Sequence, residues 1–331
     1  MENIVSENTK IRCEICPRNC SLSVGQFGFC KIRFNDGEKI VCQADGFSSG
    51  FAIDPIEKKP LYHFYPTSKA LSFGTFGCNM GCRFCQNYNI SKIGFDPRKS
   101  VKVSPEQIVN SALSYGCKSI AYTYNDPIIS FENTIKIAKI AKEYDVKNVA
   151  VTAGYISEKY LPKFFENIDG ANIDLKAFSE EFYAKNCLAH LDTVLETIKF
   201  VWYETPVELE LTTLLIPDEN DSPDELKREF DWIANNLSID VPVHISAFHP
   251  AYKMLDKERT SVEKIFSAFN IAKECGLKFV YSGNIADELT STTSCPKCKM
   301  KLIERNGYNV KILTENLSTC PNCGEKIYGR F

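Results

Sequence analysis

The sequence predicts an α/β protein: a partial (β/α)6-type barrel with a small cysteine-rich, metal-binding module at each end. Strand-like and helix-like stretches alternate between about residues 68 and 284, and most of the 15 cysteines lie in clusters. Strands that alternate with helices of 10–15 residues are typical of βαβ units and a parallel sheet. We therefore expect a cysteine-rich module at residues 1–60, the barrel at 61–290 and a second module at 291–331.

The expected barrel strands are stretches rich in β-branched and aromatic residues. They lie at residues 70–76, 119–124, 148–154, 171–177, 207–216, 241–248 and 278–283. Amphipathic helices separate them, and two begin with a serine, a proline and an acidic residue, at Ser104 and Ser222. This order is typical of a helix N-cap followed by its first turn. In such sheets, ligands bind at the carboxyl ends of the strands.

The overall composition is that of a soluble globular protein. The chain has 331 residues, of which 44% are hydrophobic and 24% charged. The net charge of −3 points to neither a nucleic acid nor a membrane partner, and only the lysines of segment 297–305 leave nucleic acid binding open. The polar N-terminus is unlike a secretion signal, and no apolar run reaches the roughly 18 residues that span a bilayer. We expect a cytoplasmic protein. The charged segment 54–60 is expected to be a solvated linker that enters the barrel.

The cysteines fall into clusters that indicate metal ligation. Disulfide frameworks belong mainly to small secreted chains, whereas grouped thiolates in a larger chain without a signal peptide favour metals. Reduced thiolates imply a reducing compartment. The clusters are Cys13, Cys16, Cys20 and Cys30; Cys78, Cys82 and Cys85; and Cys295, Cys298, Cys320 and Cys323.

The central cluster lies in GTFGCNMGCRFCQN (74–87), directly after the first expected barrel strand. Cys78, Cys82 and Cys85 supply three thiolates, whereas a [4Fe–4S] cubane takes four. One iron would therefore remain open for chemistry, with Phe84 shielding an edge of the cluster. The alternative is a zinc loop that a distant cysteine completes.

This C-x3-C-x2-C loop resembles the signature of the radical S-adenosylmethionine superfamily. The resemblance implies a radical SAM barrel in which Cys78, Cys82 and Cys85 are catalytic. It also implies that S-adenosyl-L-methionine (SAM) is the fourth ligand. One-electron reduction would cleave SAM to methionine and a 5′-deoxyadenosyl radical, which abstracts hydrogen from a substrate. An electron donor of the ferredoxin or flavodoxin type is implied as well.

Further segments resemble pyruvate formate-lyase activase-like members of the superfamily. TYNDP (123–127) stands at the turn that holds the SAM amino group, and VTAGY (151–155), NIDLKAF (172–178) and SAFHP (246–250) end the following strands. An ordinary Asp-Pro turn and a buried structural histidine are the alternatives. The residues implied in cofactor binding are Phe84, Asn125, Asp126, Thr152, Asp174, Lys176 and His249.

Motifs in the same order along nearly the whole chain resemble the AmmeMemoRadiSam-system radical SAM enzymes. That resemblance makes the AMMECR1 and Memo protein families candidate partners. It leaves the substrate open among RNA, a small molecule and a protein side chain. A glycyl radical enzyme activase is the alternative. A further alternative is a non-catalytic module with a structural cluster, which binds RNA or protein through KCKMKLIER (297–305).

The terminal clusters predict two further metal sites. The paired C-x2-C knuckles of Cys295, Cys298, Cys320 and Cys323 are typical of a zinc ribbon. Cys13, Cys16, Cys20 and Cys30 fit either zinc or a second iron–sulfur cluster, and zinc is preferred because so small a module needs a staple. Cys42 has no assigned role, and Cys187 is a candidate for facing the substrate.

Overall fold

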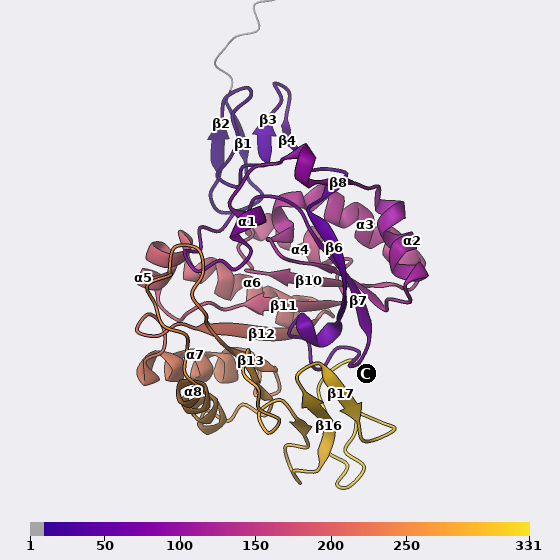
Figure 1. Cartoon of the computed structure of the whole chain (residues 1–331), viewed down its shortest axis with the longest axis vertical. Helices are drawn as coiled ribbons and strands as arrows, with labels where there is room; N and C mark the ends of the chain where they lie inside the picture. Colours follow the sequence, from indigo (N-terminus) through magenta and orange to yellow (C-terminus); the bar gives the residue numbers. More distant parts are fainter. Residues whose placement is uncertain (1–9) are drawn as a thin grey trace, which may run out of the picture.

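The computed structural model describes residues 10–331, so the polar stretch that predicts no secretion signal lies mostly outside the described residues. Its centre is an eight-stranded sheet in the order β14-β13-β12-β11-β10-β9-β7-β6 (Figure 1). The outermost strands do not pair with each other, so the described sheet is an open barrel. Its strands are β6 (Gly50–Pro55), β7 (Lys69–Gly74), β9 (Ser119–Tyr122), β10 (Lys147–Thr152), β11 (Gly170–Asp174), β12 (Glu208–Leu215), β13 (Val243–Ala247) and β14 (Val280–Gly283).

Each expected strand is present, and neighbouring strands from β7 to β14 pair in parallel. Helical crossovers follow β7 and every later strand up to β13, which confirms the α/β barrel of the (β/α)6 type. Both serine N-caps are confirmed, because Ser104 and Ser222 accept from the backbone amides of Gln107 and Glu225. The helices are α1 (Tyr88–Ser91), α2 (Pro105–Ser114), α3 (Phe131–Glu143), α4 (Leu161–Phe165), α5 (Glu180–Phe182), α6 (Leu191–Glu204), α7 (Pro223–Asn236) and α8 (Val262–Glu274).

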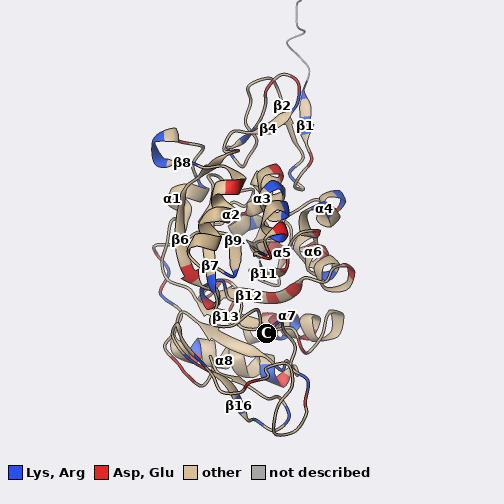
Figure 2. Ribbon diagram, turned by 90° about the vertical axis from the view of Figure 1, so that its right-hand side faces the viewer, with Lys and Arg blue, Asp and Glu red and all other residues tan. Residues whose placement is uncertain are grey.

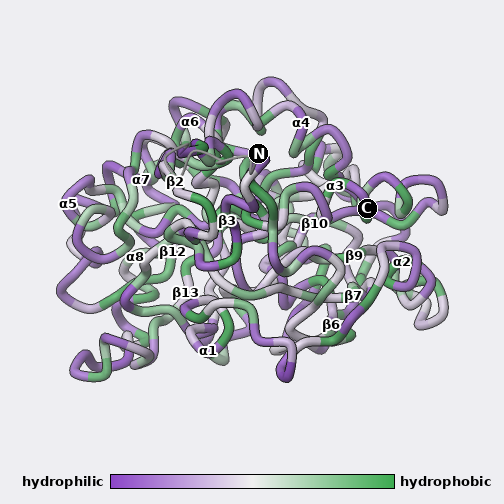
Figure 3. Tube along the Cα trace, turned by 90° about the horizontal axis from the view of Figure 1, so that it is seen from above, coloured by the Kyte–Doolittle hydropathy of each residue, from purple (hydrophilic) through white to green (hydrophobic). Residues whose placement is uncertain are grey.

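The helices around the sheet are amphipathic, as Figure 3 shows by the alternation of hydrophilic and hydrophobic residues along them. Basic and acidic residues are interspersed over the same helices and loops in Figure 2. None of the helices in residues 10–331 combines the length and hydrophobicity that a bilayer crossing requires.

The two cysteine-rich units lie at opposite ends of the molecule (Figure 1). The N-terminal module is built from short hairpins, and β5 adds a pairing with β8. The C-terminal ribbon is a three-stranded sheet. The strands are β1 (Ile11–Cys13), β2 (Cys20–Leu22), β3 (Arg33–Asn35), β4 (Ile40–Cys42), β5 (Phe47–Ser48), β8 (Val101–Lys102), β15 (Thr293–Ser294), β16 (Lys301–Asn306) and β17 (Asn309–Ile312).

Strand β6 is an addition to the expected strands. It pairs antiparallel with β7 and so joins the barrel sheet before the predicted boundary at residue 60. The prediction that segment 54–60 is a solvated linker is wrong. Asp54 and Lys59 are buried and form an ion pair with an Oδ2–Nζ distance of 2.8 Å. Burial of two opposite charges in contact keeps the segment against the barrel.

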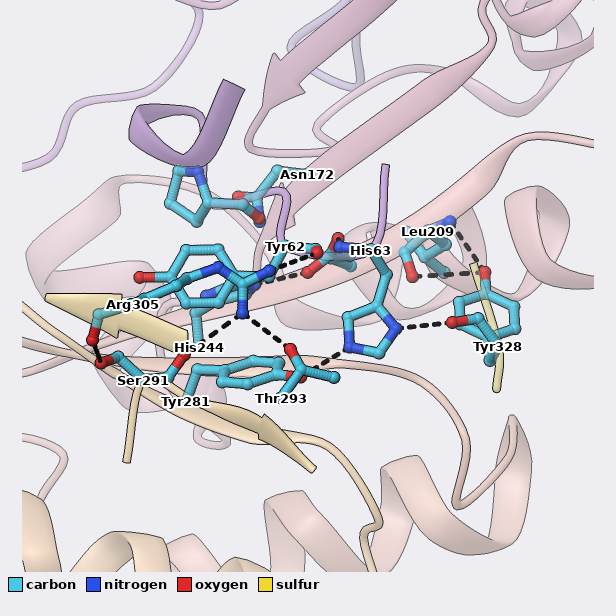
Figure 4. A network of polar contacts seen from close by, with 12 residues as sticks. Tyr62, His63, Asn172, Leu209, His244, Tyr281, Ser291, Thr293, Arg305 and Tyr328 are labelled. Atoms are coloured by element: carbon cyan, nitrogen blue, oxygen red, sulfur yellow. Dashed lines mark hydrogen bonds and ion pairs between the residues drawn. The ribbon is translucent and has the colours of Figure 1, made fainter. Parts of the chain in front are cut away.

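Arg305 of β16 anchors the ribbon to the barrel. Its side chain is fully buried, and its guanidinium donates to the Tyr62 carbonyl at 2.8 Å and to Thr293 Oγ1 at 2.7 Å (Figure 4). The guanidinium carbon also lies 4.1 Å from the centre of the Tyr62 ring, a cation–π contact. Arg305 therefore adds nothing to a basic surface in the segment 297–305.

A second set of contacts continues this network along the amino ends of β12, β13 and β14. The Glu210 carboxylate accepts from the His63 amide at 2.7 Å and contacts His244 Nε2 at 2.6 Å. His63 Nε2 in turn lies 2.6 Å from the Tyr281 hydroxyl (Figure 4). Burial lowers the pKa of His63 to about 4, so this imidazole is neutral near pH 7.

Candidate active site

The cysteine loop 74–87 follows β7 and borders a cavity of about 300 Å³ at the carboxyl ends of the strands. Cys78, Cys82 and Cys85 all line this cavity. Their sulfur atoms are not all within 4.8 Å of one another, as one tetrahedral ion would require. Three soft thiolates that face one cavity from separate positions fit a cubane cluster, in which each thiolate binds a different iron. This geometry disfavours the zinc alternative.

Backbone and side-chain contacts fix the shape of this loop. Asn125 Nδ2 donates to Thr75 Oγ1 and to the Gly77 carbonyl, both at 2.9 Å, while its Oδ1 accepts from the Thr75 amide. Lys92 Nζ donates to the Met80 carbonyl at 2.8 Å. Asn125, predicted to bind the cofactor, therefore also positions the loop.

A π-helical turn (Tyr183–Cys187) forms the second support. The amide of Gly81 donates to the Cys187 carbonyl at 2.7 Å. The Cys187 thiol lies beside Cys82 and lowers the pKa of Cys82 to about 6, with Lys176 and Lys92 acting in the same direction. Cys82 therefore ionises more readily than an ordinary thiol. Cys187 does not line the cavity, so its predicted contact with a substrate stays a prediction.

Asp126 follows β9 and is buried at the cavity wall. Its carboxylate accepts from Thr152 Oγ1 at 3.0 and 3.1 Å and from the Ala153 amide at 2.9 Å. Burial raises the pKa of Asp126 above its usual range, although these donors oppose the shift. Asp126 and Thr152, both predicted to bind the cofactor, therefore contact each other and line the cavity together.

Asp174 is the last residue of β11 and Lys176 follows it in the loop, on the next side of the cavity. Lys176 Nζ donates to Asp174 Oδ2 at 2.9 Å and lies 5.9 Å from the Phe84 ring centre. Burial alone would lower the pKa of Lys176, but Asp174 and nearby thiols outweigh burial and hold it well above its usual value. Lys176 is thus a fixed cation in the cavity wall, suited to an anionic group such as a carboxylate.

The remaining predicted residue, His249, is exposed and does not line the cavity. Its Nδ1 lies 3.3 Å from Gln86 Nε2, so it borders the cysteine loop at the rim. Sequence reasoning missed Thr212, Ser246 and Asn284, which come from β12, β13 and the loop after β14. Thr212 lines this cavity, and its Oγ1 is buried without a hydrogen-bond partner. An unpaired buried hydroxyl at a cavity wall is what a ligand would satisfy.

The four ribbon cysteines form a compact set. Cys295 and Cys323 have a sulfur–sulfur distance of 3.5 Å, as do Cys298 and Cys320, and all four sulfurs lie within 4.8 Å of one another. Tetrahedral zinc with bonds of about 2.3 Å places its sulfurs about 3.8 Å apart. Other than the ribbon, residues 10–331 contain no such compact set of possible ligands.

The N-terminal cysteines are grouped more loosely. Cys13 and Cys20 are paired across β1 and β2, and Cys13, Cys16 and Cys30 are buried. The pKa of Cys16 is raised to about 12, chiefly by burial, and the thiols of Cys13, Cys30 and Cys20 act in the same direction. The structure therefore brings the predicted set into one region without contracting it to tetrahedral spacing.

Comparison with known proteins agrees with this geometry. Residues 73–233 match the radical SAM superfamily. An uncharacterised Methanocaldococcus jannaschii protein, MJ0808, is 40% identical over 323 residues, which cover 97% of this chain and 96% of that protein. MJ1632 of the same organism, named as a putative glycyl-radical enzyme activating enzyme, is 26% identical over 64% of this chain and 79% of its own length.

Two solved structures share the fold. A radical SAM methyltransferase from Sphaerobacter thermophilus has a TM-score of 0.52 at 17% identity, covering 66% of this chain and 67% of that one. SuiB of Streptococcus suis bound to S-adenosylmethionine has a TM-score of 0.51 at 11% identity, covering 69% of this chain and 53% of that one. These two structures show the shared fold alone. The family match over residues 73–233, with the cysteine loop at the carboxyl end of a partial barrel, shows that this part of the chain is a radical SAM superfamily domain.

Proposed function

We propose that this protein is a radical SAM enzyme that acts on RNA, a small molecule or a protein side chain. The observation that carries the proposal is the cavity shared by Cys78, Cys82 and Cys85 with the polar ends of the barrel strands. With a [4Fe–4S] cluster and SAM bound, the reduced site would supply a 5′-deoxyadenosyl radical for hydrogen abstraction.

Different residues of the cavity would bind the cluster and the two charged groups of SAM. Cys78, Cys82 and Cys85 would hold three irons and leave the fourth for SAM. Lys176, already charged beside Asp174, provides a cation for the SAM carboxylate. The Asp126 carboxylate would accept hydrogen bonds from the SAM amino group, because Thr152 and Ala153 hold this carboxylate in place at the cavity wall.

The proposal is tested by anaerobic reconstitution with iron and sulfide, followed by dithionite reduction in the presence of SAM. We expect cluster absorption near 400 nm, 5′-deoxyadenosine as a product, and a change in the EPR spectrum of the reduced cluster when SAM is added. Replacing Cys78, Cys82 and Cys85 with alanine should abolish these signals. If the EPR spectrum of the reduced cluster does not change when SAM is added and no 5′-deoxyadenosine forms, the non-catalytic binding module is favoured instead.

A glycyl radical enzyme activase is the second candidate function, because MJ1632 bears that name. An activase would abstract hydrogen from a backbone glycine of a partner protein. The two functions differ in genome context: a glycyl radical enzyme encoded in the same genome would favour activation, and a genome without one would exclude it.

Three finer assignments belong to the same proposal. The order of motifs along the chain supports membership of the AmmeMemoRadiSam-system group, with AMMECR1- and Memo-family proteins as partners. A ferredoxin or flavodoxin would deliver the electron. The ribbon cysteines would hold zinc, which their compact spacing supports.

A further inference from the structure

The thiols of the N-terminal module are arranged differently from those of the ribbon. We propose that Cys13, Cys16, Cys20 and Cys30 hold a second iron–sulfur cluster, and not the zinc that the small size of the module favours. The proposal concerns a site separate from the cysteine loop 74–87, and only the total iron content expected of the unaltered protein rests on the cluster proposed for that loop.

The four thiols converge from two neighbouring turns. Cys13 and Cys20 are directly opposite each other in the β1–β2 pairing, and Cys16 lies in the turn that joins these strands. Cys30 lies in a second turn, which the hydrogen bond from the Lys31 amide to the Gly28 carbonyl closes at 2.9 Å. The two turns touch, because a Cβ built on Gly28 would lie 3.5 Å from Cys20 Sγ.

Their spacing argues against one tetrahedral ion. In the ribbon, all four sulfurs lie within 4.8 Å of one another, close to the roughly 3.8 Å that zinc imposes. No three of the N-terminal thiols meet that limit. A cluster holds its thiolates farther apart, because each thiolate binds a different iron. The loop with Cys78, Cys82 and Cys85, in which the superfamily carries its cluster, shows the same wider spacing.

The N-terminal module lies where a second cluster could transfer electrons to the cysteine loop 74–87. The Cys30 carbonyl lies so near Gly77 that a Cβ there would approach its oxygen to 1.9 Å, and Gly77 has a φ of +73°. From the other turn, Arg18 Nε donates to the Asn79 carbonyl at 2.5 Å. The module therefore packs directly against the cysteine loop. A centre that takes one electron from a low-potential donor could pass that electron on to the loop, whereas zinc has no redox chemistry.

The deciding measurement is metal content after anaerobic reconstitution with iron, sulfide and an equal amount of zinc. We expect about eight irons and one zinc per chain, since each cubane holds four irons. Replacing Cys13, Cys16, Cys20 and Cys30 with serine should leave about four irons and one zinc. The matched control, Cys275→Ser at the C-terminal end of α8, should keep about eight irons.

Four irons and two zincs per chain in the unaltered protein would overturn the proposal. Six irons would support it with a [2Fe–2S] centre. If the four-serine variant does not fold, the variant with alanine at Cys78, Cys82 and Cys85 decides instead. It should retain about four irons and a cluster EPR signal that does not respond to SAM; a variant without iron would contradict the proposal. A SAM-responsive cluster in the unaltered protein reports on the proposed function separately.

Discussion

The amino end of the barrel holds a hydrogen-bonded network of buried polar side chains, whereas the carboxyl end holds the cavity that the cysteine loop borders. At the amino end, three buried side chains make short hydrogen bonds. Arg305 bonds to the Tyr62 carbonyl, His63 to the Tyr281 hydroxyl and Glu210 to His244. At the carboxyl end, Thr212 Oγ1 is buried without a partner beside the charged pair of Lys176 and Asp174. Paired buried groups stabilise a fold, whereas an unpaired group at a cavity wall is satisfied when a ligand arrives.

Several polar atoms at the amino end are exceptions: Ser119 Oγ, Arg305 Nε and both carboxylate oxygens of Glu208 are buried without hydrogen-bond partners. Burial raises the pKa of Glu208 well above its usual value, which disfavours an unpaired charge at this position. The comparison therefore predicts that changes at the amino end alter stability, and that changes at the carboxyl end alter ligand binding.

The largest effect is expected for Arg305→Met. The methionine fills part of the space but leaves the Tyr62 carbonyl and Thr293 Oγ1 without their donor. We expect the free energy of unfolding to fall by about 3 kcal/mol or more. Urea titration measures this change, and SAM affinity of the folded variant should be unaltered. A loss below about 1 kcal/mol would mean that Arg305 does not anchor the ribbon.

A smaller loss of stability is expected on acidification, because His63 becomes protonated. The pKa of His63 is about 4 in the fold and 6.5 ordinarily, so between these values the unfolded chain binds more protons. Stability is therefore lost as the pH falls from 6.5 toward 4, by about 2–3 kcal/mol at pH 4.5. The charged or titratable groups that face this imidazole are Glu210, Arg305 and His244, and all three are retained in the variant that tests the prediction.

His63→Gln is the matched variant, because its amide retains hydrogen-bonding capacity and cannot titrate. We expect it to be less stable than the unaltered protein near pH 7 and to lose less stability on acidification. Parallel slopes of stability against pH for the two proteins would rule out His63 as the titrating group.

At the carboxyl end, Lys176→Met should weaken SAM binding about ten- to a hundredfold, the range of a lost charge-assisted hydrogen bond. The unfolding free energy should change little, because the Asp174 side chain is 33% exposed and remains solvated. Isothermal titration calorimetry on the reconstituted protein measures the affinity. The double variant Lys176→Met/Asp174→Asn controls for the charge left on Asp174, and unaltered affinity in both variants would contradict the assignment.

The smallest effect is expected for Thr212→Val. Valine has nearly the shape of threonine and removes a hydroxyl that has no partner in the fold. Stability should be equal or slightly greater, within about 1 kcal/mol. Binding of SAM or substrate should fall by up to about tenfold if the hydroxyl bonds a ligand. A variant that loses stability and binds normally would instead give Thr212 a structural role.

Much of the fold could be predicted from the sequence. The barrel strands and the N-caps at Ser104 and Ser222 depend on neighbouring residues in the chain, so periodicity and capping signals are enough to find them. The same holds for the cysteine loop, because a loop that directly follows a parallel strand must lie at its carboxyl end. The location of Cys78, Cys82 and Cys85 at this end of the barrel therefore follows from the order of residues along the chain.

What the tertiary structure decided are contacts between distant segments, which no local pattern encodes. Arg305 meets Tyr62 across 243 positions, and the unpaired Thr212 is recognised only when the neighbours of its hydroxyl are known. Thiol spacing is of the same kind: C-x2-C knuckles occur in both terminal units, but the backbone around them sets the sulfur–sulfur distances. Sequence by itself determined which residues can bind metal, and packing of the backbone decided how widely they stand apart.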